Sequence, residues 1–99
     1  MIRFSIVEEH EVTRQLAQYE QSNSRCFDLR AALDFQLARD PRTYSTRVPG
    51  FRSEVYAAWT NGDFPELPRL LVWYTVDDEK RAVTIHGVQL VLPPEETTS

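Results

Sequence analysis

The feature that most constrains the fold is a pair of apolar runs near the C-terminus, separated by a short polar stretch. Residues 69–77 and 81–92 are rich in branched and aromatic side chains, and Asp77–Lys80 lies between them. Two such runs pair as an antiparallel β-hairpin when the connection is short and polar. We therefore expect a sheet whose last two strands are neighbours both in sequence and in space.

Two further segments show the alternation of apolar and polar side chains that is typical of strands, residues 2–7 and residues 53–60. Asn61–Asp63 and the prolines that follow it predict a turn and an irregular connection to the hairpin. Pro41–Gly50 shows no periodicity, and we interpret it as a loop.

Helical spacing occupies the region between the first two strands. Residues 9–20 place Val12, Leu16 and Tyr19 on one stripe, which predicts an amphipathic helix. A second helix is predicted from about Ser24 to Arg39, and it ends there because Pro41 disfavours helical geometry at the preceding residue. Its apolar side chains form two rows: Cys26, Leu29, Leu33 and Leu37, and Phe27, Ala31, Phe35 and Ala38. So wide a stripe predicts burial on two sides, against the first helix and against the sheet.

The order strand, helix, helix, strand, strand, strand indicates an α+β fold of β-α-α-β-β-β type. We expect a mostly antiparallel four-stranded sheet with the two helices packed on one face. Residues 1–94 are expected to form a single domain, with residues 95–99 as a flexible C-terminal tail. The second face of the sheet stays partly open, and a partner or substrate would bind there.

The charge of the chain disfavours a general nucleic-acid binder. Eleven Lys and Arg residues against 15 Asp and Glu residues give a net charge of −4, whereas such binders are normally basic. Between Arg39 and Arg52, however, four arginines face a single acid, Asp40. Arginine suits bidentate contacts with carboxylate or phosphate, although codon usage is the simpler explanation of the arginine excess.

Several classes of site and location are disfavoured by what the sequence lacks. No apolar run approaches the ~18 residues of a membrane span, and the short apolar N-terminal stretch does not fit a signal peptide, so a cytoplasmic location is expected. With three glycines, a phosphate-binding loop is not expected, and His10 and His86 lack metal-ligand spacing, so we expect neither cofactor nor metal. Cys26, the one cysteine, is interpreted as a buried hydrophobic residue rather than a nucleophile.

Two positions on the predicted hairpin stand out as candidates for binding or chemistry. Alternation places Arg69 and Trp73 on the open face, where an arginine beside an exposed tryptophan can bind a base, a phosphate or a protein. The alternative is that Trp73 covers the end of the core beneath the Phe64–Pro65 loop. His86 is expected on the same face, either as a general acid or base or as a hydrogen-bonded sheet histidine.

The segment Leu71–Ile85, with its Trp-Tyr-Thr-Val-Asp-Asp-Glu and Val-Thr-Ile runs, resembles the terminal hairpin of RelE/ParE-superfamily toxins of bacterial type II toxin–antitoxin systems. Ala38–Pro41 resembles the end of the second helix in that family, and the predicted order of elements matches its fold. The resemblance implies a toxin neutralised by a cognate antitoxin. It further implies action as a ribosome-dependent mRNA endonuclease or as an inhibitor of DNA gyrase.

The sequence departs from the nuclease branch of this family at its basic positions. Leu71 stands where an arginine is usual, Tyr56–Ala58 replaces expected basic residues, and Gln89–Leu92 replaces a basic segment after the last strand. The resemblance therefore leaves open whether the chain is an enzyme. The alternative is a non-catalytic, toxin-like protein that acts only as a protein-binding module.

These considerations define a set of candidate residues. In a nuclease, Arg52 and Arg69 would hold phosphate and His86 or Tyr56 would carry a proton. Arg42, Arg47, Trp73 and Trp59 are the candidates for binding a partner or substrate. The expected partners are the antitoxin and either the ribosome with mRNA or gyrase, and a homodimer is left open.

Overall fold

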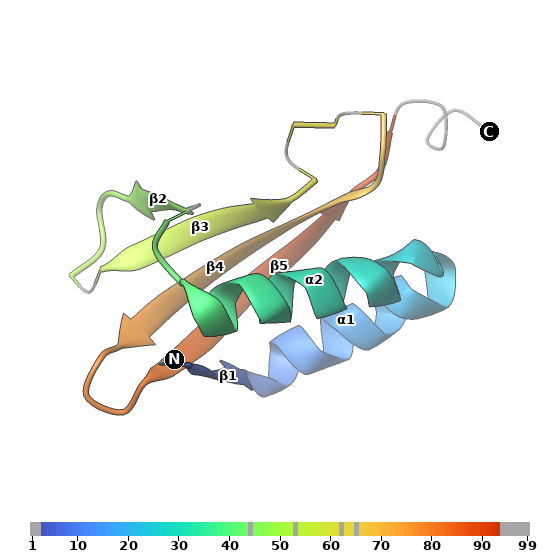
Figure 1. The fold of residues 1–99 in the computed structure, drawn as a ribbon. Coiled ribbons are helices and arrows are strands. Elements are labelled where there is room, and N and C mark those ends of the chain that lie inside the picture. Colours follow the sequence, from blue (N-terminus) through green and yellow to red (C-terminus); the bar gives the residue numbers. More distant parts are fainter. Residues whose placement is uncertain (1–2, 44, 53, 62, 65, 94–99) are drawn as a thin grey trace.

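The computed structural model describes residues 3–93 apart from residues 44, 53, 62 and 65. These residues form two helices and five strands, which confirms the α+β class (Figure 1). In chain order the elements are β1 (Ser5–Glu8), α1 (His10–Ser22), α2 (Arg25–Arg39), β2 (Ser45–Val48), β3 (Val55–Thr60), β4 (Arg69–Asp77) and β5 (Ala82–Val91). The expected tail, residues 95–99, lies outside the described residues.

The strands form one mixed sheet in the order β1-β5-β4-β3-β2. β4 and β5 pair as the antiparallel hairpin that the sequence predicts, with Arg69 opposite Val91 and Asp77 opposite Ala82. β2, β3 and β4 are also antiparallel, whereas β1 lies parallel to β5. The sheet is therefore mostly antiparallel, as expected, and its first and last strands are neighbours.

The prediction of four strands was wrong, because Pro41–Gly50 contains β2 in addition to loop residues. Arg47 lies opposite Tyr56 and Val48 opposite Val55 in the antiparallel pair with β3. A four-residue strand is too short to show a period, and its backbone is ordered by the neighbouring strand rather than by its own composition. The start of β1 also differs from the prediction, because the Phe4 N–H donates to the Ala38 carbonyl at the end of α2 (2.8 Å) instead of joining the sheet.

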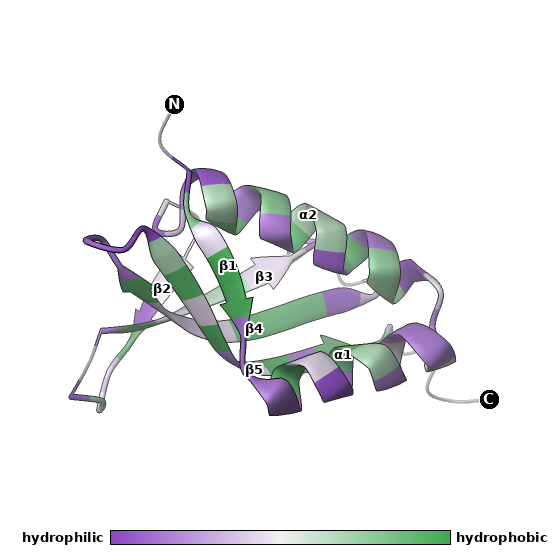
Figure 2. Cartoon of the chain, turned by 90° about the horizontal axis from the view of Figure 1, so that it is seen from below, coloured by the Kyte–Doolittle hydropathy of each residue, from purple (hydrophilic) through white to green (hydrophobic). Residues whose placement is uncertain are grey.

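Both helices cover the same face of the sheet, and the core lies between the two layers. Figure 2, which looks onto the helices, shows hydrophobic stretches of β1, β4 and β5 between them. The fully or almost fully buried apolar residues are Val12, Leu16, Cys26, Leu29, Leu33, Leu37, Ala58, Leu70, Val72, Tyr74, Val83, Ile85 and Val88. Burying each leucine side chain stabilises the fold by about 1.5–3 kcal/mol. Alternation along residues 69–77 predicts that Leu70, Val72, Tyr74 and Val76 share the face toward the core. The first three are fully buried, and Val76 is partly buried against the core.

The second helix packs against both the first helix and the sheet, as predicted, but only one of its two apolar rows is buried there, so the expected burial of the second row was wrong. The row that begins at Cys26 is buried, but Phe27 is 65% exposed and Phe35 is 59% exposed. Both α1 and the sheet contact the first row, and no element of the described chain covers the second. The guanidinium of Arg39 lies 5.1 Å from the centre of the Phe35 ring and shields part of it.

Two smaller expectations concern the helices and the cysteine. Neither helix in the described residues is long and apolar enough to cross a membrane. Cys26 is a free and buried thiol at the start of α2, as expected. Burial raises the pKa of this thiol, so the reactive thiolate is disfavoured in the folded state.

Candidate functional site

A β-bulge in the hairpin shapes the open face of the sheet. The pairing of β4 with β5 shifts between Trp73 and Tyr74: Trp73 lies opposite Gly87, Tyr74 lies opposite Ile85, and His86 is the extra residue. Ile85 and Val88 are buried beneath the helices. His86 and Gly87 lie between these two buried residues and are therefore the two residues of the bulge. Gly87 contacts Trp73 on the face of the sheet away from the helices.

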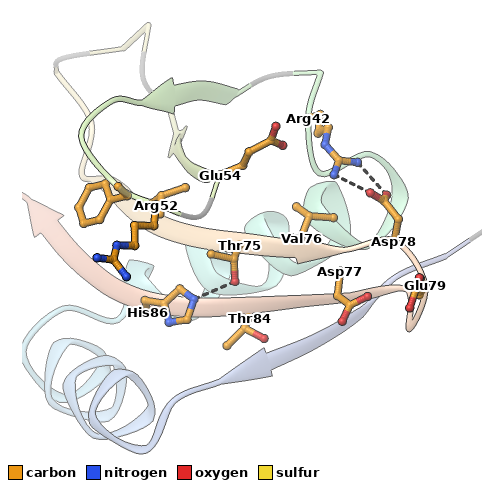
Figure 3. A pocket seen from close by; sticks show the side chains of 12 residues that line it. Arg42, Arg52, Glu54, Thr75, Val76, Asp77, Asp78, Glu79, Thr84 and His86 are labelled. Atoms are coloured by element: carbon orange, nitrogen blue, oxygen red, sulfur yellow. Dashed lines mark hydrogen bonds and ion pairs between the residues drawn. The ribbon is translucent and has the colours of Figure 1, made fainter.

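His86 is held on this open face from two directions. Its Nε2 lies 2.8 Å from Thr75 Oγ1 on β4 (Figure 3). Its Nδ1 hydrogen-bonds a carboxylate oxygen of Glu9, the residue before α1. The Glu9 backbone N–H also donates to the Ile85 carbonyl (3.2 Å), so the beginning of the helix is fixed beside the bulge. The result is a carboxylate–imidazole–hydroxyl chain.

Sequence reasoning missed Glu9 as a partner of His86. The two residues are 77 positions apart, and they meet because β1 pairs in parallel with β5 and delivers the start of α1 to the bulge. The acidic run at Glu8–Glu9 was visible in the sequence as a helix start. Its pairing with a histidine could not be found without the strand order.

A shallow hollow of ≈ 920 Å³ lies beside His86 (Figure 3). It is formed where the loop after β2 approaches the end of β4 and the first half of β5. Arg52, Thr75, Thr84 and His86 contribute to its lining. Its charged rim also contains Arg42 and four carboxylates, those of Glu54, Asp77, Asp78 and Glu79. The four carboxylates outnumber the two guanidinium groups, so the hollow repels a polyanion.

Arg42 is engaged in a structural contact. Its Nη1 and Nη2 donate to the two carboxylate oxygens of Asp78, both at 2.9 Å, and its Nε donates to the Tyr56 hydroxyl at 3.1 Å. The guanidinium also lies 5.6 Å from the centre of the Tyr56 ring. These bonds raise the pKa of Arg42 and hold the pKa of Asp78 below its usual range. Arg42 thus ties the turn after α2 to the hairpin.

Tyr56 lies on the helix side of the sheet, apart from the other candidate catalytic residues. In register it faces Tyr74, whose side chain is fully buried, and the two rings stack with centroids 5.9 Å apart. The Tyr56 hydroxyl donates to Glu54 at 3.0 Å. Since His86 projects from the opposite face, the two candidate proton carriers do not share a site.

Arg69 lies against Trp59 of the neighbouring strand and not against Trp73 of its own strand. Its guanidinium carbon lies 5.0 Å from the centre of the Trp59 ring on β3. Trp73, two pleats further along β4, packs instead against Gly87. Phe64 lines a separate hollow of ≈ 430 Å³ together with Trp59. Pro65, the other residue of the loop that was the alternative cover for Trp73, lies outside the described residues.

The candidate residues therefore fall into separate groups. Arg52 and His86 line one hollow. Arg69 and Trp59 lie near the start of β4, six residues from Thr75, which corresponds to about 20 Å along a strand. Arg47 is exposed on β2, opposite Tyr56. No group of three His, Cys, Asp or Glu residues among the described positions is arranged to hold a metal ion.

Comparisons with known proteins identify the fold. No protein-family model and no curated protein sequence matches the chain. Among solved structures, it is similar to a chain of the toxin–antitoxin complex RelBE2 from Mycobacterium tuberculosis, with a TM-score of 0.68, 16% identity and coverage of 89% of this chain and 98% of that one. It is also similar to a double arginine-to-alanine mutant of the E. coli toxin RelE in the free state, with a TM-score of 0.62, 14% identity and coverage of 87% and 81%. The chain has the fold of RelE toxins.

Proposed function

We propose that this chain is the toxin-like component of a type II toxin–antitoxin module and that its open sheet face acts by binding a protein. The fold supports the first part, because similar chains include the toxin RelE and a chain of a toxin–antitoxin complex. A cognate antitoxin is accordingly the proposed neutralising partner. The proposed cellular target is cytoplasmic, and DNA gyrase is the protein target that the family resemblance offers.

One observation carries the choice of binding over RNA cleavage, namely that the basic candidate residues do not converge. Arg69 is stacked on Trp59, Arg42 is bonded to Asp78, and Arg52 lines a hollow with an excess of carboxylates. Cleavage of RNA requires several positive groups aimed at one phosphate, where charge develops in the transition state. A protein-binding face needs only shape and apolar area, which this face supplies.

The Glu9–His86–Thr75 chain favours a second candidate function, that of an mRNA endonuclease. An imidazole oriented by a carboxylate can transfer a proton near neutral pH, and Arg52 in the same hollow could bind a phosphate. This candidate requires His86 for activity. The binding proposal does not.

Two substitutions separate these functions. Leu71→Asp places a carboxylate in the middle of the open face, while His86→Gln removes the proton carrier and leaves that part of the face intact. Under the binding proposal, growth arrest on expression of the chain is lost in Leu71→Asp and kept in His86→Gln. The nuclease candidate predicts loss in His86→Gln. Gln18→Asp, on the exposed side of α1, is the control for added charge, and thermal melts report folding.

The molecular readouts are mRNA end mapping in arrested cells and a supercoiling assay with purified protein. Intact messages together with inhibited gyrase support the proposal, whereas new His86-dependent mRNA ends contradict it. Co-expression with the product of a neighbouring short reading frame should relieve the arrest. If the chain alone never arrests growth, the toxin activity is refuted and only the fold remains.

A further inference from the structure

The part of the open face formed by Ala57, Trp59, Arg69, Leu71, Trp73 and Gln89 is called the aromatic platform here. Its members face one another across three strands: Ala57 lies opposite Trp73, and Leu71 lies between Trp59 and Gln89. Trp59 is 40% exposed, and Leu71 and Trp73 are partly exposed. In a chain with 15 acidic residues, none of the six platform residues is acidic.

Arg69 is the single charge of the platform, and it is held ready for a ligand. Stacking on Trp59 fixes the plane of its guanidinium, and its Nε is buried without a hydrogen-bond partner. None of the ion pairs found among the described residues involves Arg69. A buried donor without a partner is unfavourable, so this guanidinium is not satisfied by contacts within the described chain.

We propose that the aromatic platform binds a peptide segment of a partner protein in which an acidic side chain lies next to apolar ones. The carboxylate pairs with the guanidinium of Arg69, and the apolar side chains cover Leu71 between the two tryptophans. Trp and Arg are among the residue types most enriched at the positions that contribute most binding energy in protein interfaces. This inference rests on the proposed function, since it assigns the partner chemistry of the same face.

The charge of the platform favours a peptide over RNA. One guanidinium matches one carboxylate, while none of the other five platform residues is a cation that could pair with the repeating phosphates of a nucleic acid. Further along β4 the hollow adds Asp77, Asp78 and Glu79, which repel a polyanion that extends from the platform. An acidic residue followed by apolar ones satisfies the platform and ends before that rim.

The test is a selection of displayed random peptides on the purified full chain, followed by affinity measurements on the enriched peptides. We expect enrichment of Asp or Glu beside aromatic or aliphatic residues. Arg69→Gln should weaken these peptides about tenfold or more, and Arg69→Lys should also weaken them, because lysine keeps the charge but loses the planar fork. Arg14→Gln, on the exposed surface of α1, should leave binding unchanged.

Three outcomes overturn the inference. The first is enrichment of no peptide, or of peptides without acidic residues. The second is an unfavourable result for Arg69 itself. Either the peptides bind equally well to an Arg69→Gln variant whose melting curve shows a folded protein, or Arg69 is required for binding oligouridylate in place of peptides. The third is binding that emerges only in the Glu95→Gln, Glu96→Gln double variant, which would make the chain's own C-terminal segment the occupant. Because the assay uses purified protein, its failure is distinguishable from an absence of growth arrest.

Discussion

The indole of Trp73 lies where the side chain of any residue other than glycine at position 87 would project. The two residues are direct cross-strand neighbours, and a Cβ built on Gly87 would lie 2.9 Å from Cε3 of Trp73. An aromatic ring that packs over a glycine on the adjacent strand shields its exposed backbone and fixes the register of the pair. This contact lies at the bulge, next to His86, and joins the platform residue Trp73 to β5.

Gly87→Ala should therefore destabilise the protein by about 1–3 kcal/mol, because the methyl group displaces the indole. Urea denaturation gives the free energy of unfolding, and tryptophan fluorescence reports the movement of the ring. In the background of Trp73→Leu, which removes the ring, the same substitution should cost much less. Equal costs in both backgrounds would show that the clash is not the cause.

The hairpin itself was predictable because its signals are local. Alternation of side chains and a short polar connection give both the strands and their pairing, so the core positions Leu70, Val72 and Tyr74 were assigned correctly. β2 and the exposed Phe27 were not predictable. The first is a strand only because β3 pairs with it, and the second depends on which of two apolar rows on one helix the rest of the fold covers.

The candidate site was only partly predictable for the same reason. Alternation places Arg69 and Trp73 on the open face, but a single strand cannot reveal that Arg69 stacks on Trp59 of its neighbour. The Glu9–His86 contact depends on the parallel pair of β1 and β5 and on the bulge, neither of which leaves a sequence pattern. Contacts between strands decide the chemistry of this face.

The ion pair between Arg42 and Asp78 should make stability depend on pH. Arg42 lowers the pKa of Asp78 in the folded state, so the stabilising contribution is fully present above the unfolded-state pKa of about 3.9 and is lost as the pH falls through the folded-state pKa. Asp78→Asn should lower the melting temperature at neutral pH by a few degrees at most. The two melting curves should converge in acid, and a gap that persists there would exclude the ion pair as the cause.

Asp34 should make stability depend on pH in the opposite direction to Asp78. Burial, with a smaller contribution from Glu8, raises the pKa of this carboxyl above its usual value, and its Oδ1 is buried without a partner. The folded state therefore favours the protonated form of Asp34. Above the folded-state pKa, the ionised carboxylate destabilises the fold. This destabilisation disappears as the pH falls below the unfolded-state pKa. Asp34→Asn should raise the free energy of unfolding at neutral pH by about 1 kcal/mol.

Denaturation across a pH series checks the sign of the Asp34 effect. The advantage of Asp34→Asn should shrink toward acid pH, while Asp63→Asn, at an exposed position, should show no such trend. A variant that is less stable than the parent at neutral pH would indicate that the carboxylate has a favourable contact.

The thiol of Cys26 should be protected in the folded protein. It is fully buried, and burial raises its pKa, so both access and ionisation are disfavoured. Reaction with a chromogenic disulfide should be about 100-fold or more slower in buffer than in denaturant, because it requires an opening of the fold. Rapid labelling of the native chain would contradict the packing of α2 against the core.

The two apolar rows of α2 should differ sharply in their sensitivity to substitution. Phe27→Ser removes a side chain that is mostly in water and should change the free energy of unfolding by about 0.5 kcal/mol or less. Leu33→Ala, in the buried row of the same helix, removes core contacts and leaves a cavity, and should cost about 2–5 kcal/mol. Urea denaturation of the two variants measures this difference directly. Comparable losses would mean that the Phe27 row is covered in solution, so sedimentation of the parent chain should then reveal a self-associated species.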